Sequence, residues 1–105
     1  MHHLQSLGYT LLDRNWRTRD GELDLVMTRP GELVVVEVKT RSGDGFGHPF
    51  EAVDRRKQAR LWRLSMAWIL AHPEAARGRR LRIDAIAITG SDPASGTLEH
   101  LEDLR

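Results

Sequence analysis

The sequence predicts an α/β fold in which a mixed sheet of about five strands is flanked by helices. Polar and apolar residues alternate in 21–28, and 33–39 is a valine-rich run that alternates only from Glu37 onward; both patterns are typical of strands. A helical apolar pattern covers 54–71, and the run LRIDAIAIT at 81–89 indicates a buried strand. Because a helix that joins two strands usually makes a right-handed crossover, the strands on either side of it are expected to be parallel.

Length and composition limit the kind of protein this can be. With 105 residues the chain is expected to form a single domain, 1–105, with a modest core. It contains no cysteine, which excludes disulfides and thiolate metal sites, and no apolar run approaches the roughly 20 residues that cross a bilayer. We therefore expect a cytoplasmic protein with no membrane partner.

Charge is distributed unevenly although the formal net charge is only +1. Basic residues gather in 55–63 and 77–82, whereas acidic residues gather in 20–37 and near the C-terminus. A basic surface around an acidic pocket would suit a metal-dependent enzyme that acts on phosphates.

The N-terminal half is expected to contain the end of a helix and three strands. Residues 1–7 resemble the last turns of a helix with Gly8 as its C-cap, and 9–18 form a first strand. Pro30-Gly31 suits the centre of a type II turn, because proline presets φ and glycine accepts a positive φ. The three strands would then form an antiparallel meander.

The C-terminal half is expected to contain the long helix and two further strands. Asp54 suits the N-cap of the helix, which should end near Ala71 because a proline follows closely. Residues 74–79 and 90–96 are expected to be loops, and 97–101 an edge strand after the buried one. The predicted order is therefore helix, three strands, helix, two strands.

The turn at Pro30-Gly31 sets a register that brings acidic residues together. Asp24 would lie opposite Glu37, and Glu22 opposite Lys39, with all four side chains on one face of the hairpin. Opposed carboxylates about 5 Å apart at Cβ repel unless one is protonated or a cation lies between them. A divalent metal held by Asp24 and Glu37, with Lys39 alongside, is the arrangement that this register suggests.

Structural explanations remain open for each of these residues. Charged residues on a strand often form only the solvated face of a sheet, and two-residue hairpins prefer type I′ or II′ turns, which makes the turn type an assumption. His48 could assist chemistry from the glycine-rich loop 40–49, but a His-Pro pair there is usually a structural turn. Asp84 could bind metal, pair with an arginine or cap a helix.

A set of short motifs identifies a family. Asp24 followed by Glu37-Val38-Lys39 is the Asp…Glu-x-Lys signature of restriction-endonuclease-like nucleases. More closely, the chain resembles the YraN-like family of uncharacterised bacterial proteins, which is regarded as similar to archaeal Holliday-junction resolvases. The resemblance covers nearly the whole chain from Gly8. It is carried by GY at 8–9, NWR at 15–17, GELDL at 21–25, VEVKTR at 36–41, FG at 46–47, Val53, Lys57-Gln58 and RID at 82–84.

The resemblance implies a restriction-endonuclease-like core and a metal-dependent reaction. Asp24 and Glu37 would bind Mg²⁺ or Mn²⁺, with the Val38 carbonyl as a further candidate ligand. Lys39 would orient or deprotonate the attacking water, or stabilise the phosphate. Glu22 would join a second metal or hydrogen-bond to Lys39.

DNA is the partner that the resemblance implies, favoured also by the basic start of the long helix. Such contacts hold the phosphate backbone without reading the sequence of bases. The candidate DNA-binding residues are Arg41, Arg56, Lys57, Gln58 and Arg60.

One departure from the family pattern bears on activity. The family begins with a longer helix that carries a Gly-Glu pair, of which only the end is matched here, so nuclease competence or stability could suffer and homodimerisation could be favoured. A metal-dependent DNA endonuclease that acts on branched or otherwise structured DNA is the first hypothesis. A non-catalytic nucleic-acid-binding module is the second, and a protein-interaction domain with a vestigial acidic pocket is the third.

Overall fold

The structure is a computed structural model that describes residues 2–41, 55–89 and 97–104. His48 and Asp54, for which the sequence suggested roles, lie outside the described residues. The elements follow in the predicted order, with one short helix added. They are α1 (His2–Ser6), β1 (Thr10–Thr18), β2 (Gly21–Arg29), β3 (Glu32–Arg41), α2 (Arg55–Ala71), α3 (Pro73–Ala76), β4 (Arg80–Thr89) and β5 (Thr97–Leu101).

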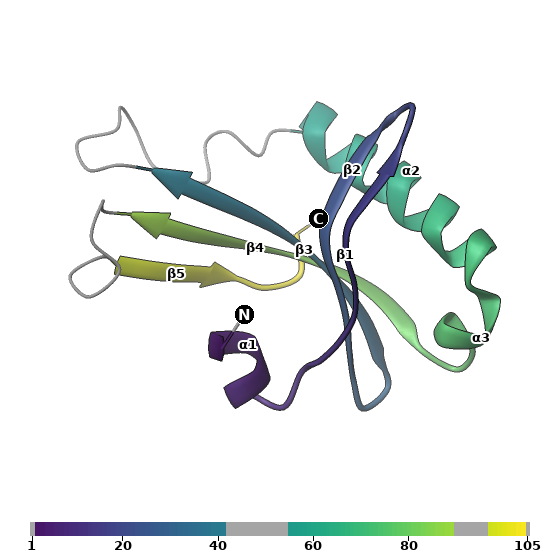
Figure 1. Cartoon of the computed structure of the whole chain (residues 1–105), viewed down its shortest axis with the longest axis horizontal. Coiled ribbons are helices and arrows are strands. Elements are labelled where there is room, and N and C mark those ends of the chain that lie inside the picture. Colours follow the sequence, from purple (N-terminus) through teal and green to yellow (C-terminus); the bar gives the residue numbers. More distant parts are fainter. Residues whose placement is uncertain (1, 42–54, 90–96, 105) are drawn as a thin grey trace.

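The five strands form one mixed sheet in the order β1-β2-β3-β4-β5 (Figure 1). β3 and β4 are parallel and are connected through α2, whereas the other three neighbouring pairs are antiparallel. This confirms the predicted meander, the crossover and the α/β fold class. β3 is the middle strand of the sheet, with β2 and β4 as its neighbours.

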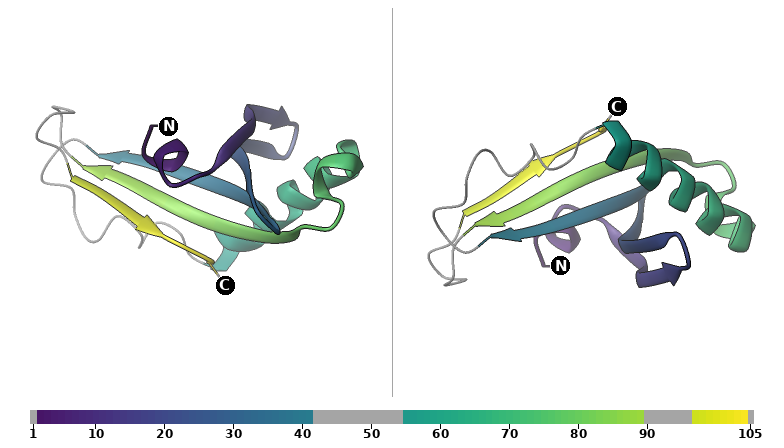
Figure 2. Two further views of the ribbon diagram at one scale, coloured as in Figure 1. Left: turned by 90° about the horizontal axis from the view of Figure 1, so that it is seen from below. Right: turned by 90° about the horizontal axis from the view of Figure 1, so that it is seen from above.

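α1 and α2 lie on opposite faces of the sheet, as the two views in Figure 2 show. The α2-side cluster joins Leu61, Leu64 and Trp68 of the helix to buried residues that include Val35 of β3. The α1-side cluster contains Leu4 of α1 together with buried residues of β2, β3 and β4. Residues of β3 alternate between the two clusters because successive side chains of a strand point to opposite faces.

The β2–β3 turn has the backbone that the sequence predicted at Gly31, whose φ is 78°. The ladder begins with Arg29 opposite Glu32 and continues through Val26 opposite Val35, as the predicted register required. The proline-glycine pair therefore fixes which residues of the two strands face each other.

The predicted loop at 74–79 is wrong in its first residues, since α3 occupies Pro73–Ala76. Proline at the start and Glu74 in the first turn both favour a helix, because the proline lacks an amide hydrogen and the acid suits the helix dipole. No helix in the part of the chain that the structure describes has the length and apolarity needed to cross a membrane.

Candidate functional site

β2 and β3 stop pairing just before their acidic residues. The ladder ends at Leu25 opposite Val36, so the predicted pairing of Asp24 with Glu37 does not occur as a ladder pair. Instead, the Val38 amide donates a hydrogen bond of 2.8 Å to Oδ2 of Asp24. A side chain thus takes the place of the main-chain carbonyl that would otherwise accept this bond. Because N–H and C=O of one strand residue point the same way, the Val38 carbonyl faces the same opening.

Glu22 lies at the margin of this group. Its Oε2 accepts a bond of 2.8 Å from Nε of Arg17, which faces it across the β1–β2 ladder. The hydrogen bond to Lys39 that was considered for Glu22 is therefore not formed. Lys39 contacts Glu37 and Lys57 instead. The reason is that β2 stays paired with β1 here after it has separated from β3.

Glu37 and Lys39 share the face of the sheet that α2 covers. They flank Val38, whose side chain packs against the α1-side cluster, so strand alternation turns both toward α2. Nζ of Lys39 lies 3.1 Å from Oε1 of Glu37. Lys57, in the first turns of α2, makes a side-chain contact with Lys39 from the other side. β3 and α2 thereby bring one acid and two amines together.

The charges of the group act on one another. Burial raises the pKa of the Asp24 carboxyl above its ordinary value, and repulsion from Glu37 and Glu22 adds to this against the opposing effect of the Val38 amide. Burial lowers the pKa of Lys39, but its contacts with Lys57 and Glu37 outweigh burial, and the pKa is raised. Contact with Lys39 lowers the pKa of Lys57, because two adjacent ammonium groups repel.

An open cleft of about 350 Å³ adjoins the Asp24 carboxylate. It is lined by Arg14 and Asn15 of β1, Asp24 and Leu25 of β2, and Val38 of β3. The cleft could admit a hydrated metal ion and a phosphate group beside Asp24. Arg14 and Asn15 were not among the predicted site residues, although Asn15 begins the NWR motif, which marked it as a position of interest.

The predicted DNA-binding residues of α2 lie in the first turns of the helix, where Lys57 meets Lys39. Arg60 acts electrostatically on Lys57, so the basic start of the helix belongs to the same electrostatic environment. Arg41 lies opposite Thr89 at the end of the β3–β4 ladder. On α2, Lys57 and Gln58 are partly buried, and Arg56 and Arg60 are exposed.

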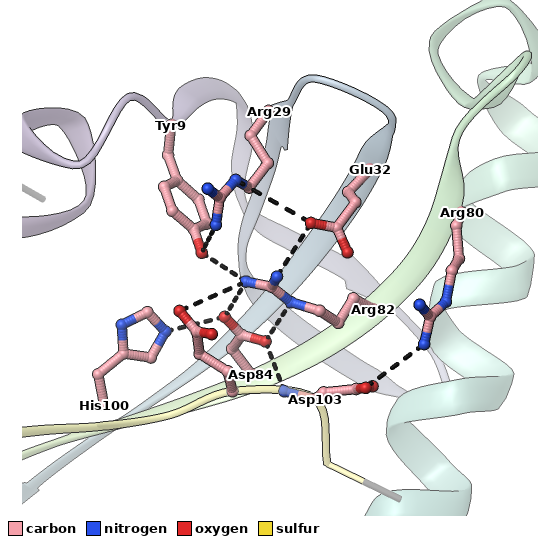
Figure 3. Close-up of polar contacts among 9 residues, drawn as sticks. Tyr9, Arg29, Glu32, Arg80, Arg82, Asp84, His100 and Asp103 are labelled. Carbon is pink, nitrogen blue, oxygen red and sulfur yellow. Dashed lines mark hydrogen bonds and ion pairs between the residues drawn. The ribbon is translucent and has the colours of Figure 1, made fainter.

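A second polar cluster lies on the α1 side of the sheet, centred on Arg82 (Figure 3). The guanidinium of this buried residue donates bonds of 2.9 and 2.8 Å to the two oxygens of Asp84 and one of 3.0 Å to Glu32. It also donates to the hydroxyl of Tyr9. Of the roles considered for Asp84, pairing with an arginine is the one that the structure has.

Asp84, His100 and Glu102 could also hold a metal ion, because they offer ligand atoms within 4.8 Å of one another. Oδ2 of Asp84 lies 2.8 Å from Nε2 of His100, and Oδ1 accepts a bond of 2.9 Å from the Asp103 amide. A cation bound there would compete with the Arg82 guanidinium for both oxygens. We therefore place the proposed chemistry at the other cluster, on the α2 side. His100 and Glu102 were not predicted, because nothing near them in the sequence points to Asp84.

Comparison with known proteins finds one family throughout. The model of the uncharacterised protein family UPF0102 matches residues 1–88. A UPF0102 protein of Clavibacter michiganensis is 55% identical over 86 residues, which are 82% of this chain and 71% of the relative. UPF0102 proteins of Beutenbergia cavernae and Paenarthrobacter aurescens are 50% and 47% identical, each over 96% of this chain and over 84% and 82% of the relative.

Proposed function

The chain belongs to the uncharacterised protein family UPF0102, as the resemblance to the YraN-like family predicted, and from this premise we propose that it is a metal-dependent DNA endonuclease. The reaction would be hydrolysis of a phosphodiester bond, and the preferred substrate would be branched DNA. Such an enzyme would act on the bacterial chromosome in the cytoplasm.

The observation that carries the proposal is the opening between β2 and β3. There, a carboxylate with a raised pKa, a second carboxylate and two lysines act on one another, and an open cleft adjoins the first carboxylate, Asp24. The available ligand atoms of the opening are oxygens, from Asp24, Glu37 and the Val38 carbonyl. Oxygen ligands with two negative charges fit Mg²⁺ or Mn²⁺, which would also relieve the repulsion between the two acids.

The surrounding residues have distinct roles in this proposal. Asp24 and Glu37 hold the metal, which would supply an activated water and stabilise charge on the phosphate. Glu37 also holds Lys39 at 3.1 Å, which orients the ammonium toward the water or a phosphate oxygen. Glu22 supports the site through its effect on Asp24, and Arg56 and Arg60 hold the DNA backbone from the exposed side of α2.

Cleavage of labelled four-way junction, flap and linear duplex DNA with Mg²⁺ or Mn²⁺ tests the proposal. We expect cleavage by the wild-type protein, and a loss of about a hundredfold or more in Asp24→Asn and Lys39→Ala, since each removes a group that acts on the reacting phosphate. Arg77→Gln is the matched control, because Arg77 is an exposed cation of the segment after α3.

Two other outcomes would contradict the nuclease proposal. DNA binding that weakens steeply with salt, without cleavage by any metal, would favour a non-catalytic DNA-binding module. Cleavage that survives in Asp24→Asn would show that the activity comes from elsewhere.

A further inference from the structure

The two lysines that meet at the site are the only lysines in the sequence. The chain contains 16 Lys and Arg residues, and every one other than Lys39 and Lys57 is arginine. Lys39 lies on β3 and Lys57 on α2, on opposite sides of the 42–54 connection. The fold therefore brings the two lysine side chains into contact at one place.

Lysine and arginine serve different purposes at a binding site. An ammonium is a compact point charge with three donors that rotate freely, whereas a guanidinium is a flat fork of five donors. Where only positive charge facing solvent is needed, this chain uses arginine, as at Arg55, Arg56, Arg60 and Arg63, all of which are exposed. The two lysines occupy partly buried positions. A compact ammonium group leaves more room for a bound ligand there than a guanidinium group would.

Two ammonium groups in contact repel each other, and an anion placed between them relieves this repulsion. Glu37 pairs directly with Lys39 at 3.1 Å. One oxygen of Asp24 is bound by the Val38 amide, and Glu22 is bound by Arg17. Arg60 adds further positive charge next to Lys57. An anion that accepts hydrogen bonds from both amines would therefore be attracted to this position.

The scaffold holds the two amines at a fixed spacing. Lys57 lies one turn before Leu61, which is buried with Leu64 and Trp68 against the sheet. Lys39 lies in the ladder with β4, opposite Ala87. Both side chains thus extend from backbone that packing keeps in place, which lowers the entropic cost of binding a ligand between them.

We propose that Lys39 and Lys57 together form a binding subsite for one phosphate group, whose oxygens accept hydrogen bonds from both ammonium groups. That this group is a phosphodiester of DNA rests on the proposed function. Lys57 then contacts the reacting phosphate, rather than a distant part of the DNA backbone, and the substrate lies across the junction of β3 and α2.

Because the chain has only two lysines, NMR of protein labelled with ¹³C and ¹⁵N in lysine resolves the two amines directly. The probe is inorganic phosphate, titrated at constant ionic strength against chloride. We expect the side-chain signals of both lysines to shift with one common midpoint. In Lys57→Gln, we expect the phosphate affinity reported by Lys39 to fall at least about fivefold, because a charged donor is lost.

Arg77→Gln, which removes one exposed positive charge away from the subsite, is expected to leave the midpoint unchanged. The inference is overturned if the two lysine signals have different midpoints or do not respond to phosphate. It is also overturned if Lys57→Gln and Arg77→Gln weaken phosphate equally, since the effect would then be general electrostatics. The wild-type titration decides the question even if a variant fails to fold.

These results separate the subsite from the nuclease proposal. A common midpoint in a protein that cleaves no DNA supports the subsite and removes the nuclease. Metal-dependent cleavage without a shared response of the lysines keeps the nuclease and removes the subsite.

Discussion

Asp24 illustrates how one residue can serve the site at a cost to the fold. Burial and the neighbouring acids raise the pKa of its carboxyl, which means that the folded state disfavours the charged form. Between the ordinary value of 3.8 and the raised value, the folded state binds more protons than the unfolded state, so stability falls as pH rises through this window. At neutral pH the full penalty is present.

Asp24→Asn is therefore expected to stabilise the protein at pH 7. The amide oxygen can still accept the hydrogen bond from Val38, while the negative charge is removed. Allowing for solvent screening of this half-exposed group, we expect a gain of about 0.5 kcal/mol in the free energy of unfolding, measured by urea denaturation. The gain should disappear as pH falls below the ordinary value of 3.8, because the carboxyl is then protonated in both the folded and the unfolded state.

Metal ions should stabilise the wild-type protein relative to Asp24→Asn. Mn²⁺ is expected to raise the melting temperature of the wild type and not that of Asp24→Asn, because a ligand that binds only the folded state stabilises it. Asp20→Asn, a change at an exposed carboxylate in the β1–β2 turn, should retain the response. An equal response of all three proteins would argue against metal binding at Asp24.

At the scale of elements, β1 carries an unusual backbone beside the cleft. Asn15 has a φ of 54°, in the left-handed region that most side chains avoid. It lines the cleft together with Asp24, where β2 separates from β3. Asparagine is one of the few residues that tolerate this conformation, so both the residue and its position are set by the backbone.

Two replacements of Asn15 distinguish the effect of backbone strain on stability from the effect of losing the side chain. Asn15→Ala is expected to reduce the free energy of unfolding by about 1 kcal/mol, because alanine disfavours a positive φ. Asn15→Gly should cost less, although it removes the same side chain. Urea denaturation measures both, with Thr10→Ala on the same strand as the control. A larger loss for glycine than for alanine would rule out strain as the cause.

The elements themselves were predictable because their signals are local. The strand patterns in 21–28 and 33–39, the helical period in 54–71 and the Pro30-Gly31 turn each depend on neighbouring residues, and the structure has all of them. The end of the β2–β3 ladder was not predictable, since the Asp24 side chain competes there with main-chain pairing.

The site was predictable only in part, because some of its contacts depend on how distant elements pack and not on neighbouring residues. The motif indicated Asp24, Glu37 and Lys39, and the structure brings these residues into mutual electrostatic contact. The contact of Lys57 with Lys39 depends on how α2 packs on the sheet. His100 reaches Asp84 only because β5 pairs with β4 in a register that places it opposite Ile86.

At the scale of the whole molecule, the Arg82 cluster ties the sheet together. Its members come from the residue before β1, the β2–β3 turn region, β4 and β5, and include Tyr9, Arg29, Glu32, Asp84 and His100. Burial raises the pKa of Asp84, but the bonds from Arg82, the Asp103 amide and His100 outweigh it and lower the pKa. The cluster therefore contributes stability when Asp84 is charged.

Acid should lower the free energy of unfolding of the protein through the protonation of Asp84. Because its folded pKa lies below its unfolded value of 3.8, the contribution is complete above that pH and is lost as pH falls through the lowered value. We expect Asp84→Asn to lose roughly 3 kcal/mol at pH 7, since it leaves the buried Arg82 without its charged partner. Its stability should also change less than that of wild type between pH 5 and pH 2, as urea denaturation can show.

The confinement of lysine to one place also has a practical consequence for biosensor work. Amine coupling to a sensor chip, reductive methylation before crystallisation and amine-directed fluorescent dyes have only two side chains to modify, and both lie beside the acidic opening. Under the proposed function, a sample modified at either side chain is expected to lose activity. Attachment through an engineered tag leaves that region unmodified.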